Sequence, residues 1–297
     1  MEIGKVDWSG EWDGEFFEIE VNGRHVKGCH WRHDSPKFVF VFFHGLCSSI
    51  SHNANFLREF PQIGGSSIAT DHIGHGKSQG LPALTTVDEM VEEMCSLLRY
   101  ARVNYPSTPI FLMGHSLGGL VMLTFLLKHR IEISFLKGVI AHAPWLSSAG
   151  GKDPKGWLLK VLKVLARFTP GKQIDSGLRI QYSPYPQEYK EMALALPFLC
   201  MNVTPSLLYS TVWAKEFVRN NVELYPRELP MLFLQGMKDS CVEIDVNLEW
   251  CSRLKELCGE SSIAIKTLDE GFHDLYKSET RKESFDALLE FIERYRK

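Results

Sequence analysis

The stretch IFLMGHSLGGLVMLTFLLK (110–128) decides the fold prediction. A short apolar run of strand character leads into GHSLG (114–118), and an apolar run of helical length follows. Glycines two positions before and after a serine relieve the crowding of a sharp strand-to-helix turn that exposes the serine hydroxyl. GxSxG also occurs by chance, so its place between a strand and a helix is what predicts Ser116 as a nucleophile.

Apolar runs of strand character alternate with helical patterns on both sides of this stretch. A hairpin over residues 15–33 turns at Asn22-Gly23, which favours two antiparallel strands. The alternation predicts an α/β fold with a mostly parallel eight-stranded sheet, an antiparallel N-terminal hairpin and helices on both faces. The other six strands are expected at FVFVFF (38–43), SSIAT (66–70), IFLMG (110–114), LKGVIAHA (136–143), LPMLFLQG (229–236) and SSIAIKTL (261–268). Helices are expected at Val87–Asn104, Leu117–Lys128, Val246–Leu257 and Glu279–Arg296.

The alternation stops after Pro144 and resumes near Leu229. So long a segment exceeds one crossover, which predicts a cap over residues 145–228 inserted between two parts of a core, 1–144 and 229–297. One helical pattern in the cap has an apolar stripe opposite basic residues, and two hypotheses stay open: a helix packed on the core, or a lid that rests on lipid. The stripe contains Trp157, Leu158, Val161, Leu162, Leu165 and Phe168, and the basic residues are Lys160, Lys163 and Arg167.

Composition narrows the class of protein. The chain is 44% apolar and 23% charged, which is typical of a globular protein, and its net charge of −3 disfavours nucleic-acid partners. Seven cysteines without a CxxC pair, and an acidic N-terminus without a signal pattern, predict a cytoplasmic protein. No window reaches the length of a membrane span, so membrane contact would be peripheral, through the cap. The oligomeric state is not predicted.

The reactive serine needs an imidazole to take its proton. Three histidines follow Ser116 in the chain. His273 is the predicted base, because DEGFHD (269–274) forms a loop between the last strand and the last helix. His142, at the end of a strand, is a minor candidate, and His129 suits the carboxyl end of a helix.

A carboxylate must orient that imidazole, and Asp239 is the predicted acid because it follows MLFLQG at the carboxyl end of a strand. The alternative is a turn aspartate that caps the next helix. Asp245 is the fallback, although it better suits the N-cap of the helix near Val246. Asp269 and Asp274 flank the histidine too closely to be favoured.

Acyl transfer also needs backbone N–H donors for the oxyanion. We expect Leu117, directly after the serine, and Leu46, in the loop after FVFVFF, to supply them. His44 is expected to shape that loop. Chemistry of this kind requires no metal or organic cofactor.

Taken together, these residues resemble the monoacylglycerol lipase and lysophospholipase-like serine hydrolases, also grouped with the serine aminopeptidase-type α/β-hydrolases. The resemblance rests on FFHGL (42–46), DHIGHGKS (71–78), GHSLGG (114–119), QG (235–236) with Asp239, and His273. It implies the α/β-hydrolase fold and the same triad and oxyanion donors. It also implies a mobile cap over an apolar acyl tunnel, and a long-chain carboxylic ester as substrate. Leu46 departs from the pattern, because lipase members commonly have a small residue there.

Hydrolysis of a lipid-like ester, such as a monoacylglycerol or lysophospholipid, is therefore the leading hypothesis. A peptidase would need an acidic group in the cap to hold an amine, and Glu188 and Glu191 are its candidates. A non-catalytic ligand-binding protein of the same fold is the third hypothesis. Cys241, close to the predicted acid, is either a pocket thiol sensitive to thiol reagents or an inert buried one.

Overall fold

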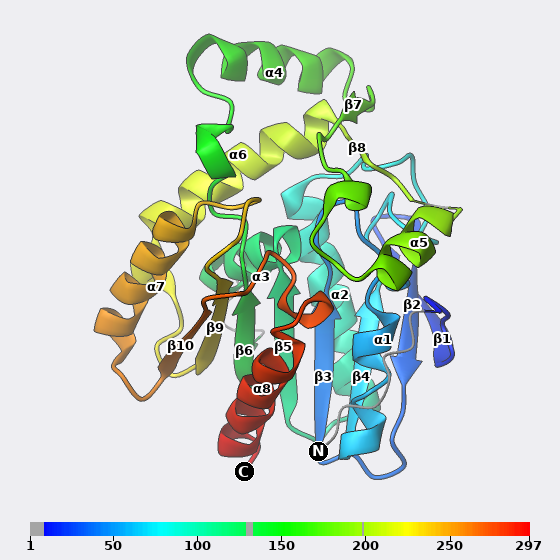
Figure 1. Cartoon of the computed structure of the whole chain (residues 1–297), viewed down its shortest axis with the longest axis vertical. Coiled ribbons are helices and arrows are strands. Elements are labelled where there is room, and N and C mark those ends of the chain that lie inside the picture. The colour runs from blue at the N-terminus through cyan, green and yellow to red at the C-terminus, as the bar shows by residue number, and fades with distance from the viewer. Residues whose placement is uncertain (1–8, 129–132, 198) are drawn as a thin grey trace.

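An eight-stranded sheet forms the centre of the computed structural model, which describes residues 9–128, 133–197 and 199–297 (Figure 1). The first two strands and the β2–β4 pair are antiparallel, and every later pair is parallel. The predicted sheet with its antiparallel N-terminal hairpin is confirmed. In spatial order the strands are β1 (Glu15–Val21), β2 (Arg24–Trp31), β4 (Gly65–Thr70), β3 (Phe38–Phe43), β5 (Ile110–His115), β6 (Leu136–His142), β9 (Met231–Gly236) and β10 (Ile263–Leu268).

Both faces of the sheet are covered, as the apolar run of β3 requires. Its alternate residues Val39, Val41 and Phe43 belong to one hydrophobic core, and Phe38, Phe40 and Phe42 belong to the other. The first core lies under α2 (Val87–Asn104), α3 (Leu117–Lys128) and α7 (Ile244–Cys258). The second lies under α1 (Ala54–Leu57) and α8 (Arg281–Tyr295). A strand buried on both faces therefore reads as an unbroken apolar run.

Helix α3 is buried on all sides from Leu117 to Leu127. It lies against β5 and contacts both α2 and α6 (Pro205–Asn220), which explains why its sequence lacks a polar face. The helix after the serine is therefore enclosed along almost its whole length, and its first residue is fixed in place.

Most of the segment between β6 and β9 lies beyond the carboxyl ends of the central strands, and its last part returns along the sheet to the start of β9 (Figure 1). Its outermost element is α4 (Gly156–Phe168), the helix predicted from the apolar stripe, which packs against α6. The sequence did not predict the short sheet of β7 (Ile174–Asp175) and β8 (Asn202–Val203), nor helices α5 (Gln187–Ala195) and α6. The predicted boundaries of the cap stay a prediction.

Some predicted elements begin at other residues than expected. Strands β9 and β10 start two residues after the predicted Leu229 and Ser261, since the N–H of Leu229 and of Ser262 close turns onto Pro226 and Gly259. Helix α7 starts at Ile244 with Glu243 at its N-cap, so the N-cap prediction for Asp245 is wrong. None of the described helices is long and apolar enough to cross a membrane.

We predict that Phe40→Ala destabilises the protein by about 3–5 kcal/mol, the usual cost of deleting a buried aromatic ring. Phe40 is fully buried and stacks on Phe60 with ring centroids 4.1 Å apart. Urea unfolding measures the loss. The control, Phe16→Ala, removes a ring that is 61% exposed and should cost far less. Equal losses in the two variants would contradict the assignment of Phe40 to the core.

Candidate active site

Ser116 occupies the turn between β5 and α3 in a left-handed conformation, with φ of 54°. Its N–H donates to the His142 carbonyl, and its own carbonyl accepts from the N–H groups of Leu120 and Trp145, all at 3.0 Å. A side chain at Gly114 would lie 2.4 Å from the Gly118 carbonyl oxygen, and one at Gly118 would lie 2.2 Å from that of Phe43. The glycines of GxSxG therefore allow the tight packing around the serine, as predicted.

A cavity of about 660 Å³ opens beside this turn, within the usual size range of small-molecule sites. Ser116, His273 and Leu46 line it, together with apolar side chains contributed by the segment between β6 and β9. Asp239 lies behind His273 and does not line it. The apolar lining includes Trp145, Ile174, Leu178, Ile180, Met201, Val203, Leu208 and Val212.

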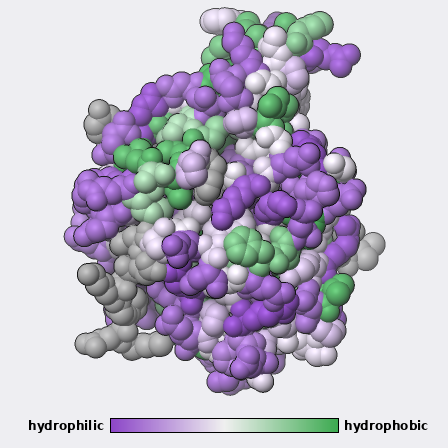
Figure 2. Space-filling model, turned by 90° about the vertical axis from the view of Figure 1, so that its right-hand side faces the viewer, coloured by the Kyte–Doolittle hydropathy of each residue, from purple (hydrophilic) through white to green (hydrophobic). Residues whose placement is uncertain are grey.

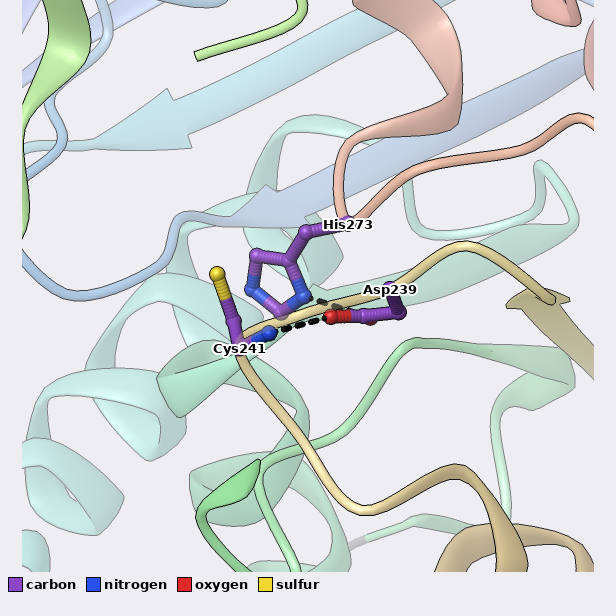
Figure 3. A group of neighbouring side chains, drawn as sticks. All are labelled: Asp239, Cys241 and His273. Carbon is purple, nitrogen blue, oxygen red and sulfur yellow. Dashed lines mark hydrogen bonds and ion pairs between the residues drawn. The ribbon is translucent and has the colours of Figure 1, made fainter. Parts of the chain in front are cut away.

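His273 and Asp239 come from loops after neighbouring parallel strands, β10 and β9. The imidazole Nδ1 lies 2.7 Å from Oδ2 of Asp239 (Figure 3). A carboxylate only accepts hydrogen bonds, so Nδ1 donates and Nε2, on the side of the ring away from Asp239, is left as the acceptor. This is the tautomer that a general base acting on a serine hydroxyl requires.

The Asp239 carboxylate is fixed from several sides. Oδ1 accepts from the N–H groups of Cys241 and Val242, at 2.8 and 3.2 Å, and Oδ2 also accepts from Gln235 Nε2 at 3.3 Å. Burial alone would raise the Asp239 pKa, but His273 and these hydrogen bonds outweigh it, and the pKa lies below its ordinary value. The fallback, Asp245, lies in the first turn of α7.

Both expected oxyanion donors belong to chain segments next to the serine. Leu117 is the first residue of α3, where backbone N–H groups have no partner within the helix. Leu46 follows Gly45, where an added Cβ would lie 3.1 Å from Cβ of Ser116. The loop after β3 therefore passes directly over the serine.

The remaining histidine candidates have other surroundings. His142 is buried, and its Nε2 accepts from the Leu275 N–H at 3.3 Å. Burial lowers its pKa to about 3, which keeps the ring neutral. His115 donates from Nε2 to the carbonyl of His273 at 3.2 Å and so holds the loop of that histidine. The prediction for His129 falls outside the described residues.

Cys241 also lines the cavity. Its sulfur, an Asp239 oxygen and a His273 nitrogen lie within 4.8 Å of one another, and these are donor types that also bind zinc (Figure 3). The three residues lie together because the Asp239 carboxylate is hydrogen-bonded both to His273 and to the backbone N–H of Cys241. Burial, and then Asp239, raise the thiol pKa to about 11, so the thiol stays protonated near neutral pH and reacts slowly.

Two ion pairs in the cavity wall, one buried and one partly buried, were not predicted. Asp274 lies 2.5 Å from Lys277 next to His273, and Asp153 lies 2.6 Å from Lys215, whose ammonium also lies over the Trp145 ring. The spacing of Asp274 and Lys277 was visible in the sequence, but only the short helix after His273 makes it a pair. Asp153 and Lys215 are 62 positions apart in the chain, so no local sequence pattern predicts that they pair.

The fold and the site define a serine hydrolase of the α/β-hydrolase class. The chain belongs to the family described as serine aminopeptidase, S33, which matches residues 34–280. The expectation of a carboxylic ester hydrolase resembling the monoacylglycerol lipases is confirmed at the level of this class.

Individual relatives are distant. The chain is 28% identical over 148 residues to a monoacylglycerol lipase of Mycolicibacterium smegmatis, a match that spans 49% of this chain and 51% of that protein. It is 22% identical to phospholipase YtpA of Bacillus subtilis, over 89% of this chain and 98% of that protein. A soluble variant of monoglyceride lipase from Saccharomyces cerevisiae, solved with a substrate analog, has the same fold. Its TM-score is 0.82 with 14% identity, and 96% of each chain is covered.

We predict that Asp274→Asn costs about 3–5 kcal/mol at neutral pH, because it leaves the Lys277 ammonium buried without its partner. Burial alone would raise the Asp274 pKa. The effect of Lys277 and the nearby histidines is larger and opposite, so the pKa lies well below the ordinary 3.8. Because the folded pKa is the lower one, this stabilisation is complete above about pH 5 and declines as the pH falls.

Urea unfolding of wild type and variant at several pH values measures this difference. The control is Asp286→Asn, which breaks the exposed Lys282–Asp286 pair and should cost less than about 0.5 kcal/mol. A penalty for Asp274→Asn that does not change between pH 7 and pH 3 would contradict the prediction.

Proposed function

We propose that this protein hydrolyses the carboxylic ester of a lipid such as a monoacylglycerol or lysophospholipid, through an acyl-enzyme on Ser116. The observation that carries the proposal is the 2.7 Å contact of His273 with Asp239 at the cavity that Ser116 also lines. The names of the relatives, a monoacylglycerol lipase and a phospholipase, support the substrate class.

In the first half of the reaction, Ser116 Oγ attacks the ester carbonyl while Nε2 of His273 takes the hydroxyl proton. The carbonyl oxygen becomes an oxyanion that accepts hydrogen bonds from the N–H groups of Leu46 and Leu117. Asp239 keeps the imidazole oriented and stabilises its charged form. The tetrahedral intermediate then expels the alcohol, which receives the proton from His273.

In the second half, water gives a proton to His273 and attacks the acyl-enzyme. The second intermediate collapses, releasing the fatty acid and returning the proton to Ser116. The apolar side chains of the cavity suit an acyl chain, and we assign this lining to a cap of residues 145–228. Each methylene of the acyl chain that moves from water into the cavity contributes about 0.8 kcal/mol to the binding free energy, so substrates with long acyl chains should bind most tightly.

An aminopeptidase would need a carboxylate that is free to bind the substrate amine. Glu188 and Glu191 are exposed and do not line the cavity. Among its described lining residues, Asp153, Asp175 and Asp274 are each already paired with a cation. The ester hydrolase is therefore the better supported hypothesis.

Helix α4 supports membrane contact through the cap. Leu162 is its only buried side chain, whereas Trp157 and Phe168 are 74% and 77% exposed. Figure 2 shows apolar side chains at the end of the molecule where Figure 1 places α4. The basic residues Lys160, Lys163 and Arg167 flank this apolar surface. Exposed apolar and basic side chains on one helix suit an anionic lipid surface, which would bring the substrate to the cavity.

Ser116→Ala is expected to abolish labelling by a fluorophosphonate probe and to lower kcat by at least about 10⁴-fold, because the nucleophile is lost. Initial rates on monoacylglycerols, lysophospholipids and p-nitrophenyl butyrate identify the head group. The matched control, Ser240→Ala, changes another serine of the cavity lining and should label normally. A folded wild type that neither labels nor hydrolyses any of these esters would disprove the proposal and favour a ligand-binding protein.

The double variant Trp157→Ser/Phe168→Ser should bind anionic phosphatidylglycerol vesicles more weakly and lose most activity on vesicle-borne monoacylglycerol. Its activity on soluble p-nitrophenyl butyrate should stay within about twofold, because α4 lies far from the chemistry. Vesicle co-sedimentation and initial rates measure both effects. Phe16→Ser/Val103→Ser, which changes exposed apolar residues of β1 and α2, is the control. Equal vesicle binding by the two double variants would rule out α4 as the membrane contact.

A further inference from the structure

His44 is hydrogen-bonded to the peptide group that joins Gly45 to Leu46. The ring is buried, and burial holds its pKa well below the ordinary value, so it is neutral. Its Nδ1 lies 2.8 Å from the Gly45 carbonyl oxygen, and its Nε2 accepts from the His72 N–H at 3.0 Å. A carbonyl only accepts, so the ring proton is on Nδ1. The Gly45 C=O and the Leu46 N–H belong to one planar trans peptide and point in opposite directions.

His72 holds His44 from the other side. Its Nε2 donates to the His44 carbonyl at 2.8 Å, and the two rings stack with centroids 3.7 Å apart. Its Nδ1 lies 3.0 Å from Oε1 of Glu93, with a proton between them. Both ring nitrogens are therefore engaged, and the ring cannot turn without breaking two hydrogen bonds.

Glu93 is the fixed end of this chain of contacts. It lies on α2 with a fully buried side chain, and its carboxylate also accepts from Thr70 Oγ1 at 3.0 Å and from the Ile73 N–H at 3.1 Å. Burying a carboxylate is costly unless hydrogen bonds compensate it. Every one of these bonds goes to β4 or the loop after it, which carries His72.

We propose that Glu93 is a positioning residue for the oxyanion hole, acting through His72 and His44 on the Leu46 N–H. The inference rests on the proposed function, because it assumes that Leu46 donates to the oxyanion. It also gives a role to DHIGHGKS (71–78), which has no side chain in the reaction.

Glu93→Leu tests the inference, because it removes the acceptor while keeping an apolar side chain of similar size. We expect kcat to fall about 10- to 100-fold with KM within about twofold, since oxyanion donors act mainly in the transition state. The affinity for an alkyl trifluoromethyl ketone, which forms a tetrahedral adduct with the serine, should fall in parallel. Glu93→Gln should stay within about fivefold, since its amide donates to His72 Nδ1 while its oxygen accepts from Ile73.

The matched control is Glu92→Leu, which changes the exposed neighbouring glutamate of α2 and should leave kcat unchanged. An unchanged kcat in Glu93→Leu, or a loss confined to KM, would overturn the inference. Inactivity of the wild type would instead count against the proposed function.

A second measurement needs no variant and covers the case in which Glu93→Leu does not fold. Nitrogen-15 NMR of the histidine rings in the wild-type protein should show His44 protonated on Nδ1 alone. Protonation on Nε2 would overturn the inference, because that tautomer has no proton to donate to the Gly45 carbonyl.

Discussion

The left-handed backbone of Ser116 is the constraint on which the site depends. A non-glycine residue in such a conformation costs about 1–3 kcal/mol, so both flanking elements must hold it. Strand β5 lies in the middle of the sheet, and α3 is enclosed on all sides. Gly114 and Gly118 let the two elements approach within van der Waals distance. The apolar character of IFLM and LGGLVMLTFLL is thus what supports a strained polar residue between them.

The parallel sheet then brings the other groups to the same edge. β9 and β10 are neighbours, so the loops that follow them start side by side and need only a few residues to place Asp239 and His273 in contact. The loop after β3 reaches the serine from the opposite side, where Gly45 permits close approach. Residues more than a hundred positions apart in the chain therefore meet because parallel strands share one carboxyl edge.

This dependence explains what the sequence could predict. Apolar runs predicted the strands, because residues buried on both faces of a sheet must be apolar. Asp239 and His273 were predicted from their positions, because each lies in a loop that follows a strand. The sequence did not predict α5 and α6, whose packing partners lie on distant segments. The sequence favours Asp245 as an N-cap because it precedes an apolar pattern that starts at Val246, but the helix begins two residues before that pattern, at Ile244. Cap chemistry alone does not fix a helix start, because packing can extend the first turn.

Glu93 illustrates the limit in a different way. It lies three residues after Met90 and four before Leu97, so helical periodicity places it beside the buried stripe of α2, where a charge is unexpected. The sequence contained this conflict, but its partner His72 is 21 positions away and no local rule joins them. Apolar residues in place of a whole buried ionic pair often cost no stability, whereas removing Glu93 alone leaves His72 Nδ1 and the Ile73 N–H without their acceptor. A buried carboxylate at that position is therefore better explained by the direction it imposes on the loop after β3 than by any contribution to folding.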